Sequence, residues 1–279
     1  MLRNLFKTAF RSLNKDRGMA TLNVLGLAVG MACFILIGLF VKDELTFDRF
    51  HSKVDRIYRG MTLFESGFYM GMPDYLLTTL QERVPGVEAV ARIDPRQPAI
   101  MDFEGELVFE NENYQADQAI FDVFDFSLMF GNEDNALLTD QSIVISAYIM
   151  DKYFEGQNPI GQSLKMVGKE HAFLVTGVLN EIPDNSRFKF NFITKAPDSG
   201  FNTEQEKWKM SGISYFLTNE GTDLKKLQTE IDAMAKEMAY PYSDQSNFLI
   251  ERFGDLHLKS DYSVTSSGVA GDIKFLRIY

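Results

Sequence analysis

The side chains in this sequence best suited to metal binding or nucleophilic chemistry are its three histidines and its single cysteine. His51, His171 and His257 stand far apart, and none has a second His or Cys at metal-ligand spacing. We therefore expect all three to be surface or turn residues. Cys33 lies in an apolar run. Because it is the only cysteine, neither a disulfide nor a cysteine-based metal site can form within one chain.

Phosphate-binding and nucleophile motifs are also missing. A phosphate-binding loop needs GxxxxGK[ST], and Gly168-Lys169-Glu170 lacks both the earlier glycine and the hydroxyl residue. There is no GxSxG motif either. Asp122 and Asp125 fit a solvated acidic surface, and Asn185-Ser186-Arg187 fits a turn that returns the chain to a strand. We expect no catalytic residue, no metal site and no cofactor, so any ATP hydrolysis belongs to a separate subunit.

Composition and charge narrow the class of protein. The 279 residues are 45% apolar and 24% charged, which is enough to build a hydrophobic core. The formal net charge is −11, although residues 1–18 carry five basic side chains against one acidic. Everything after residue 18 is therefore strongly acidic and repels phosphates, which argues against nucleic acid as a partner.

An uncharged run at residues 19–41 is long enough to be a transmembrane helix. At about 1.5 Å per residue it reaches about 34 Å, against a hydrocarbon core of about 30 Å. The alternative is a cleaved signal peptide, whose apolar run is shorter and ends in a small-residue cleavage site. This run instead ends at Lys42-Asp43-Glu44. The basic N-terminal flank predicts that residues 1–18 lie in the cytoplasm and that residues from 42 onward lie in the periplasm. The helix between them then crosses the cell inner membrane.

Two features of the N-terminal region predict contacts with lipid and with other helices. Arg3, Lys7, Arg11 and Lys15 repeat every four residues beside an apolar stripe, which predicts an amphipathic basic helix over 1–18 on the lipid surface. An ordinary basic flank remains the alternative. Gly26 and Gly30 form a GxxxG pattern suited to close helix packing, although glycine without such a role is common in membrane helices.

The remaining sequence predicts an α+β domain. Residues 42–55 form a stalk in which the membrane helix continues outward and breaks near Ser52. Strand–helix–strand patterns occur over 56–94 and 212–253, and we expect them to pack as one split α/β sandwich with both helices on one sheet face. A β-rich stretch between them has a helix at 147–154 and a hairpin over 162–179. The predicted divisions are 56–118 with 205–260 for the α/β (porter-like) part, 119–204 for an inserted mostly-β (sabre-like) subdomain, and 261–279 for a return segment.

Several stretches follow one another in the order found in a known family. They are LNVLGLAVGMA, KDELTFDRFH and VDRIYR, then FDVFDFSLMFGN, SIVISAYIMDKYF, NPIGQSLK and VTGVLNEIPDNSRFKFNF, and finally LTNEGTD, DLHLKSD and GDIK. On these residues the chain resembles the N-terminal portion of an FtsX-like ABC transporter permease with a MacB-like periplasmic core domain, of the type common in Bacteroidetes. The resemblance covers nearly the whole chain.

The resemblance implies a fold and a function. The fold is one transmembrane helix followed by a periplasmic domain of two βαβ units split by the β-rich insertion, with a second transmembrane helix expected after residue 279. The function is efflux or release of a substrate, driven by a separate ABC ATPase whose motion reaches the outer domain through the stalk. The implied partners are a second permease copy, as a homodimer or paired permease, and a periplasmic adaptor. The alternatives are a single-pass anchored binding or sensor protein and an anchored enzyme, but the sequence offers the enzyme no clustered polar site.

Overall fold

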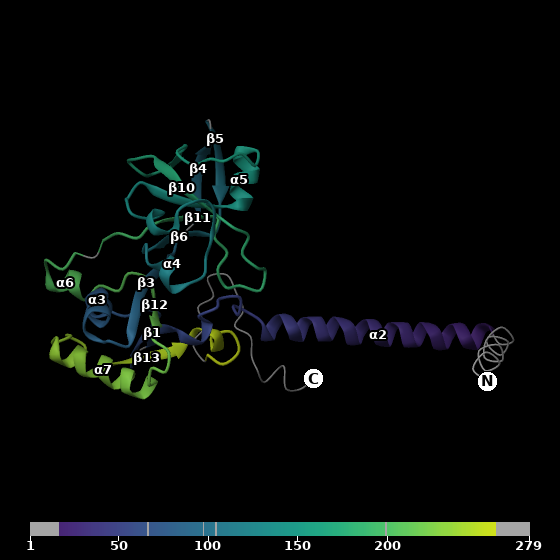
Figure 1. Ribbon diagram of the computed structural model, residues 1–279, viewed down its shortest axis with the longest axis horizontal. Coiled ribbons are helices and arrows are strands. Elements are labelled where there is room, and N and C mark those ends of the chain that lie inside the picture. Colours follow the sequence, from purple (N-terminus) through teal and green to yellow (C-terminus); the bar gives the residue numbers. More distant parts are fainter. Residues whose placement is uncertain (1–16, 66, 97, 104, 199, 261–279) are drawn as a thin grey trace. The chain divides into compact units, whose positions relative to one another are not determined.

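A computed structural model describes residues 17–65, 67–96, 98–103, 105–198 and 200–260 (Figure 1). The basic stripe of Arg3, Lys7, Arg11 and Lys15 and the return segment 261–279 lie outside these residues. The chain divides into two units, Met1–Thr46 and Phe47–Tyr279, and each is described by itself.

The first unit contains α2 (Arg17–Leu45), which is long and apolar enough to cross a membrane. The mean hydropathy of its most apolar 18-residue stretch is 2.7, and no residue of that stretch is buried. The helix ends at Leu45 and not near Ser52, because the chain turns from Thr46 onward and Asp48 has a φ of 58° that no α-helix accommodates. A Cβ added at Gly26 or Gly30 would meet no atom within 4 Å, so their packing against another helix stays a prediction.

The second unit is built on two interleaved strand–helix–strand units, as the sequence predicts. The first runs through β1 (Ile57–Phe64), α3 (Asp74–Arg83) and β3 (Val87–Pro95), and the second through β12 (Ile213–Thr218), α7 (Leu224–Glu237) and β13 (Ser246–Arg252). The strand order is β13-β1-β12-β3, with every neighbouring pair antiparallel. Each unit therefore places one strand between the two strands of the other.

Both crossover helices pack on the same face of this sheet. The carboxylate of Asp223 caps α7 by accepting the N–H of Lys225 at 2.9 Å. The buried faces of α3 and α7 share one core with the sheet, in which Leu80, Ile231 and Phe216 are fully buried. The opposite face carries a second core of aromatic side chains around α4 (Ile120–Val123). The phenylalanines of residues 121–130 therefore serve mainly as core.

The sheet continues from β3 without a break into the β-rich part. The order is β6-β11-β8-β10-β9-β4-β5, with β7 paired to β10 and β2 to β1. The strands are β2 (Gly67–Tyr69), β4 (Ala99–Phe103), β5 (Glu106–Glu110), β6 (Asn113–Ala116), β7 (Leu128–Gly131), β8 (Ser142–Ser146), β9 (Ser163–Met166), β10 (Phe173–Leu179) and β11 (Phe192–Lys195). The short helices are η1 (Val54–Arg56), η2 (Glu133–Asn135), α5 (Ala147–Phe154), α6 (Glu204–Lys207) and η3 (Phe253–Asp255).

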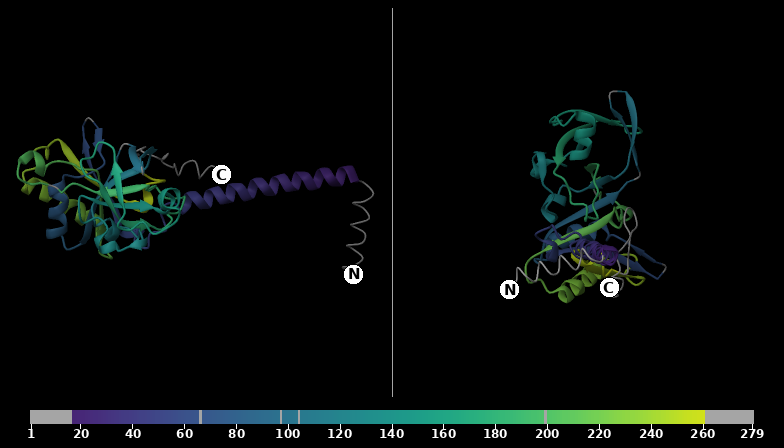
Figure 2. Two further views of the ribbon diagram at one scale, coloured as in Figure 1. Left: turned by 90° about the horizontal axis from the view of Figure 1, so that it is seen from above. Right: turned by 90° about the vertical axis from the view of Figure 1, so that its right-hand side faces the viewer.

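The β-rich part forms one end of this unit, and α7 lies at the other end (Figures 1 and 2). The predicted hairpin over 162–179 is confirmed, since β9 and β10 pair antiparallel. β4 and β5 precede residue 118, yet β4 pairs with β9. The limits of the inserted subdomain therefore stay a proposal, because the strands before and after the predicted boundary at residues 118 and 119 belong to one continuous sheet.

Candidate functional site

The three histidines lie in different surroundings. The ring of His257 stacks on Phe47 with centroids 3.8 Å apart, and His171 Nε2 lies 3.2 Å from the carbonyl oxygen of Asp140. His51 lies in a run of turns, as one of the two predicted alternatives has it, but it is only 1% exposed and is therefore not a surface residue. The described residues contain no group of three or more His, Cys, Asp or Glu side chains placed to hold a metal ion.

The buried residues that hold the start of the second unit form the candidate site. We call Phe47–Val54 the junction segment, because it follows directly on the unit that contains α2. Asp48 is 1% exposed and donates its backbone N–H to the carbonyl of Asn185 at 2.8 Å. Its φ of 58° is one that aspartate tolerates better than most residues. The predicted turn at Asn185–Arg187 is therefore also the docking partner of Asp48.

The carboxylate of Asp48 is paired and hydrogen-bonded. It accepts Arg187 Nε at 2.6 Å, the Arg187 backbone N–H at 2.8 Å and the Ser186 hydroxyl at 3.3 Å. The Arg187 guanidinium also lies 4.9 Å from the centroid of the Phe253 ring, a cation–π contact. Burying the Asp48 carboxylate without these partners would cost folding free energy. The Asp48–Arg187 pair therefore attaches the junction segment to residues 185–187.

His51 packs its ring into an aromatic cluster of Phe50, Phe124, Phe126 and Phe253, with centroid distances between 3.9 and 5.7 Å. Its Nδ1 accepts the backbone N–H of Asp125 at 3.1 Å, which places the ring proton on Nε2. Burial lowers the pKa of His51 to about 4, although Asp48 and Asp125 act to raise it. The imidazole is therefore neutral near pH 7.

Two further contacts fix the end of the junction segment. The carboxylate of Asp125 accepts the backbone N–H of Ser52, and Lys53 Nζ donates to the carbonyl of Asp122 at 3.0 Å. Asp122 and Asp125 are exposed, as expected of an acidic surface, but both also hold the junction segment.

The attachment draws on three parts of the chain that are far apart in sequence. These are residues 122–126, 185–188 and 253–257, and each overlaps one of the stretches that carry the family resemblance. Asp48 and His51 are not predicted as site residues from the sequence, and Arg187 is predicted only as part of a turn. The sequence signal for them is a charged or polar residue among phenylalanines, in TFDRFH and in NSRFKF, since a charged residue in such a setting is buried only when it is paired.

A family model described as a MacB-like periplasmic core domain matches residues 20–234. The chain belongs to this family. The match covers α2 and most of the second unit, and the mixed α+β fold with one apolar N-terminal helix agrees with the resemblance seen in the sequence. No curated protein matches the chain.

We call the second unit, Phe47–Tyr279, the MacB-like domain. Solved structures support its fold. A domain of a permease protein from Porphyromonas gingivalis is 20% identical and has a TM-score of 0.62, covering 82% of this chain and 99% of its own. The periplasmic region of MacB from Actinobacillus actinomycetemcomitans is 15% identical, with a TM-score of 0.51 and coverage of 71% and 89%. The extracellular domain of the ABC-type transporter YknZ from Gram-positive bacteria is 14% identical, with a TM-score of 0.50 and coverage of 69% and 99%.

Proposed function

We propose that this chain is the N-terminal part of a permease subunit that couples ATP hydrolysis by a separate ABC ATPase to movement of the MacB-like domain, for efflux or release of a substrate. The observation that carries the proposal is the attachment of the junction segment by Asp48–Arg187 and His51. A mobile linker would absorb a displacement of the chain at this point. A segment held by buried ionic and aromatic contacts passes the displacement to the domain, since packed cores deform little.

The proposal extends to location and partners. The charge flanking α2 favours the cell inner membrane with the N-terminus in the cytoplasm and the MacB-like domain in the periplasm. Arg3, Lys7, Arg11 and Lys15 would contact anionic lipid, and Gly26 and Gly30 would pack against other membrane helices. The assembled transporter would contain two permease copies and the ATPase, with a periplasmic adaptor as a further partner.

The test uses the intact protein in its own membranes. Spin labels at Glu220→Cys and Glu170→Cys, in a Cys33→Ser background, report movement within the MacB-like domain and between copies. We expect co-purification with an ABC ATPase, and a change in label distances when a non-hydrolysable ATP analogue is added. If the protein neither associates with an ATPase nor changes its label distances with nucleotide, the proposal is wrong.

A second measurement separates this proposal from a single-pass anchored binding or sensor protein. An immunoblot of native membranes with an antibody against the MacB-like domain gives the mass of the natural protein. A mass well above the 31.8 kDa of this chain supports a permease with further membrane helices. A mass near 31.8 kDa favours the anchored binding or sensor protein.

A further inference from the structure

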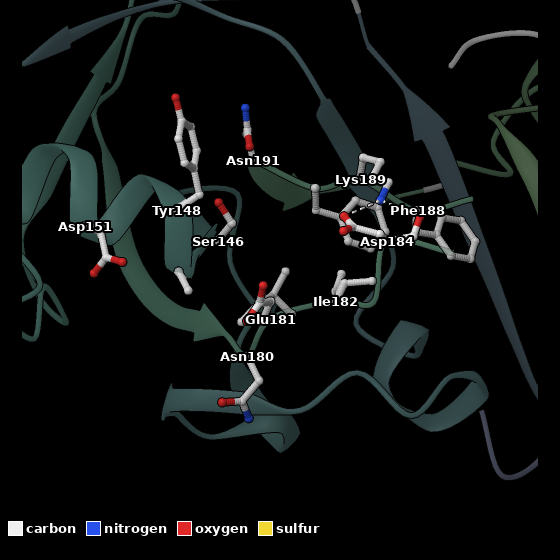
Figure 3. A pocket seen from close by; sticks show the side chains of 13 residues that line it. Ser146, Tyr148, Asp151, Asn180, Glu181, Ile182, Asp184, Phe188, Lys189 and Asn191 are labelled. Carbon is white, nitrogen blue, oxygen red and sulfur yellow. Dashed lines mark hydrogen bonds and ion pairs between the residues drawn. The ribbon is translucent and has the colours of Figure 1, made fainter. Parts of the chain in front are cut away.

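A cavity in the second unit lies between the N-terminus of α5, the segment that follows β10, and residues 188–191 (Figure 3). Its volume of about 410 Å³ is within the range of about 300–1,000 Å³ found for ligand pockets. In Figure 3, Tyr148 and Asp151 extend from α5, and Glu181 and Ile182 extend from the segment after β10. The chemistry of these walls indicates what the cavity can hold.

The lining combines apolar groups with uncharged hydrogen-bonding groups. Ile182 supplies the most accessible apolar side chain, since Leu179 and Phe190 are only 1% and 4% exposed. Asn180 and Asn191 supply amide groups, although their Nδ2 atoms also donate to Ser127 at 2.9 Å and to Glu110 at 3.4 Å. Side-chain amides suit the N–H and C=O groups of a polypeptide backbone, and the apolar groups suit its aliphatic or aromatic side chains.

The charge of the cavity is negative. Asp151, Glu181 and Asp184 line it, and its one cation is Lys189, whose Nζ donates to the Asp184 carbonyl at 2.8 Å and lies 3.5 Å from the Asp184 carboxylate. Within the described parts of the chain, no Lys, Arg or His nitrogen lies within ion-pair distance of Asp151 or Glu181. Two carboxylates in this cavity are therefore free to pair with an incoming cation.

A second cavity of about 210 Å³ shares the wall formed by residues 179–182 and adds Phe50 and Asp125. The two cavities therefore adjoin at residues 179–182, and the second reaches the junction segment at Phe50. Asp125 likewise has no cationic partner among the residues that the structure describes. The carboxylates thus line two adjoining cavities, and a ligand that pairs with all three must reach both of them.

We propose that these two cavities bind a cationic amphipathic polypeptide segment. Its Lys or Arg side chains would pair with Asp151, Glu181 and Asp125, and its apolar side chains would pack on Ile182 and Phe50. Acidic peptides and nucleic acids are excluded by repulsion. Binding at this place would touch the junction segment directly, yet it requires no ATPase, so the site goes beyond the proposed function.

The experiment measures binding by the full-length protein in nanodiscs of uncharged phosphatidylcholine. The probe is a short amidated peptide of alternating lysine and leucine with a fluorescent label, followed by anisotropy. We expect the double variant Asp151→Asn/Glu181→Gln to raise the Kd about ten-fold, because two charge pairs are lost. Ile182→Ser should also weaken binding, because it removes apolar contact.

The matched control is Glu220→Gln/Asp244→Asn, which removes two exposed carboxylates elsewhere on the second unit and changes the net charge equally. It should leave the Kd unchanged within about two-fold. Equal weakening by both double variants would show attraction to the acidic surface as a whole and overturn the proposal. So would tight binding of a glutamate–leucine peptide, or no binding by the wild type. No ATPase is present, so failure here leaves the permease proposal intact.

Discussion

His51 holds its ring among four phenylalanines while its Nδ1 accepts the N–H of Asp125. Protonation at Nδ1 would break this hydrogen bond and bury a charge in an aromatic cluster. This explains why the pKa of His51 falls from 6.5 to about 4 in the folded protein. The unfolded chain therefore binds a proton more tightly than the folded one between these two pH values.

We predict that acid destabilises the MacB-like domain through His51. The contribution of neutral His51 is fully present above pH 6.5 and is lost as the pH falls toward 4, because the folded pKa is depressed. The loss amounts to at most about 3 kcal/mol of unfolding free energy. Urea unfolding followed by the fluorescence of Trp208, the single tryptophan, measures it at several pH values.

The control for this prediction is a change of histidine. His51→Phe should flatten the dependence between pH 6.5 and 4, because it removes the buried imidazole and keeps an aromatic ring in the cluster. An unchanged slope in His51→Phe would assign the acid sensitivity to carboxylates instead.

The Asp48–Arg187 pair gives a second prediction at the residue scale. Asp48→Ala should lower the free energy of unfolding by about 3–5 kcal/mol, because it leaves the Arg187 guanidinium without its buried partner. The double variant Asp48→Ala/Arg187→Ala should cost less than the sum of the two single variants, since neither charge is then left unpaired. Urea unfolding of all three proteins measures the coupling.

Asp184→Ala serves as the comparison, because Asp184 is fully exposed and its ion pair with Lys189 is long. It should change stability by less than about 0.5 kcal/mol. An Asp48→Ala protein as stable as wild type would show that the junction segment is not held by this pair, and would weaken the case for coupling.

At the scale of elements, short-range signals predict α5 and α7 well. α5 has the predicted bounds, Ala147–Phe154, with Ser146 as its N-cap, and α7 follows the Asp223 cap and its apolar periodicity. The pairing of β6 with β11 and of β8 with β10 was not predictable, since these parallel pairs join residues far apart in sequence. The end of α2 was missed for the same reason, because the turn at Asp48 depends on Asn185 and Arg187.

The packing of α3 and α7 on one sheet face gives a prediction at this scale. Leu80→Ala should lower the free energy of unfolding by about 2–5 kcal/mol, because Leu80 is fully buried in the core that the two helices share. Glu82→Ala, on the exposed face of α3, should be nearly neutral. Urea unfolding compares the two, and a neutral Leu80→Ala would mean that the helices are not needed to stabilise the sheet.

For the molecule as a whole, the junction segment sits where an apolar helix gives way to an acidic folded domain. The sequence predicts both parts and their order, but the attachment appears only in three dimensions, because Asp48 and His51 find their partners more than seventy residues away along the chain. Coupling by this attachment requires that the two ends of α2 lie on opposite sides of the membrane. The topology of the chain therefore tests whether Phe47–Val54 can carry a displacement from the cytoplasm to the MacB-like domain.

We predict that α2 separates two compartments. In a Cys33→Ser background, which removes the only cysteine, Glu220→Cys and Lys15→Cys each provide one reactive thiol. A membrane-impermeant maleimide added to spheroplasts should label Glu220→Cys, which is exposed on the MacB-like domain, and should label Lys15→Cys only after the membrane is broken. Labelling of both positions in intact spheroplasts would place both ends of α2 on the same side. A displacement generated in the cytoplasm could then not reach the domain through Phe47–Val54, and the permease proposal would lose its mechanical basis.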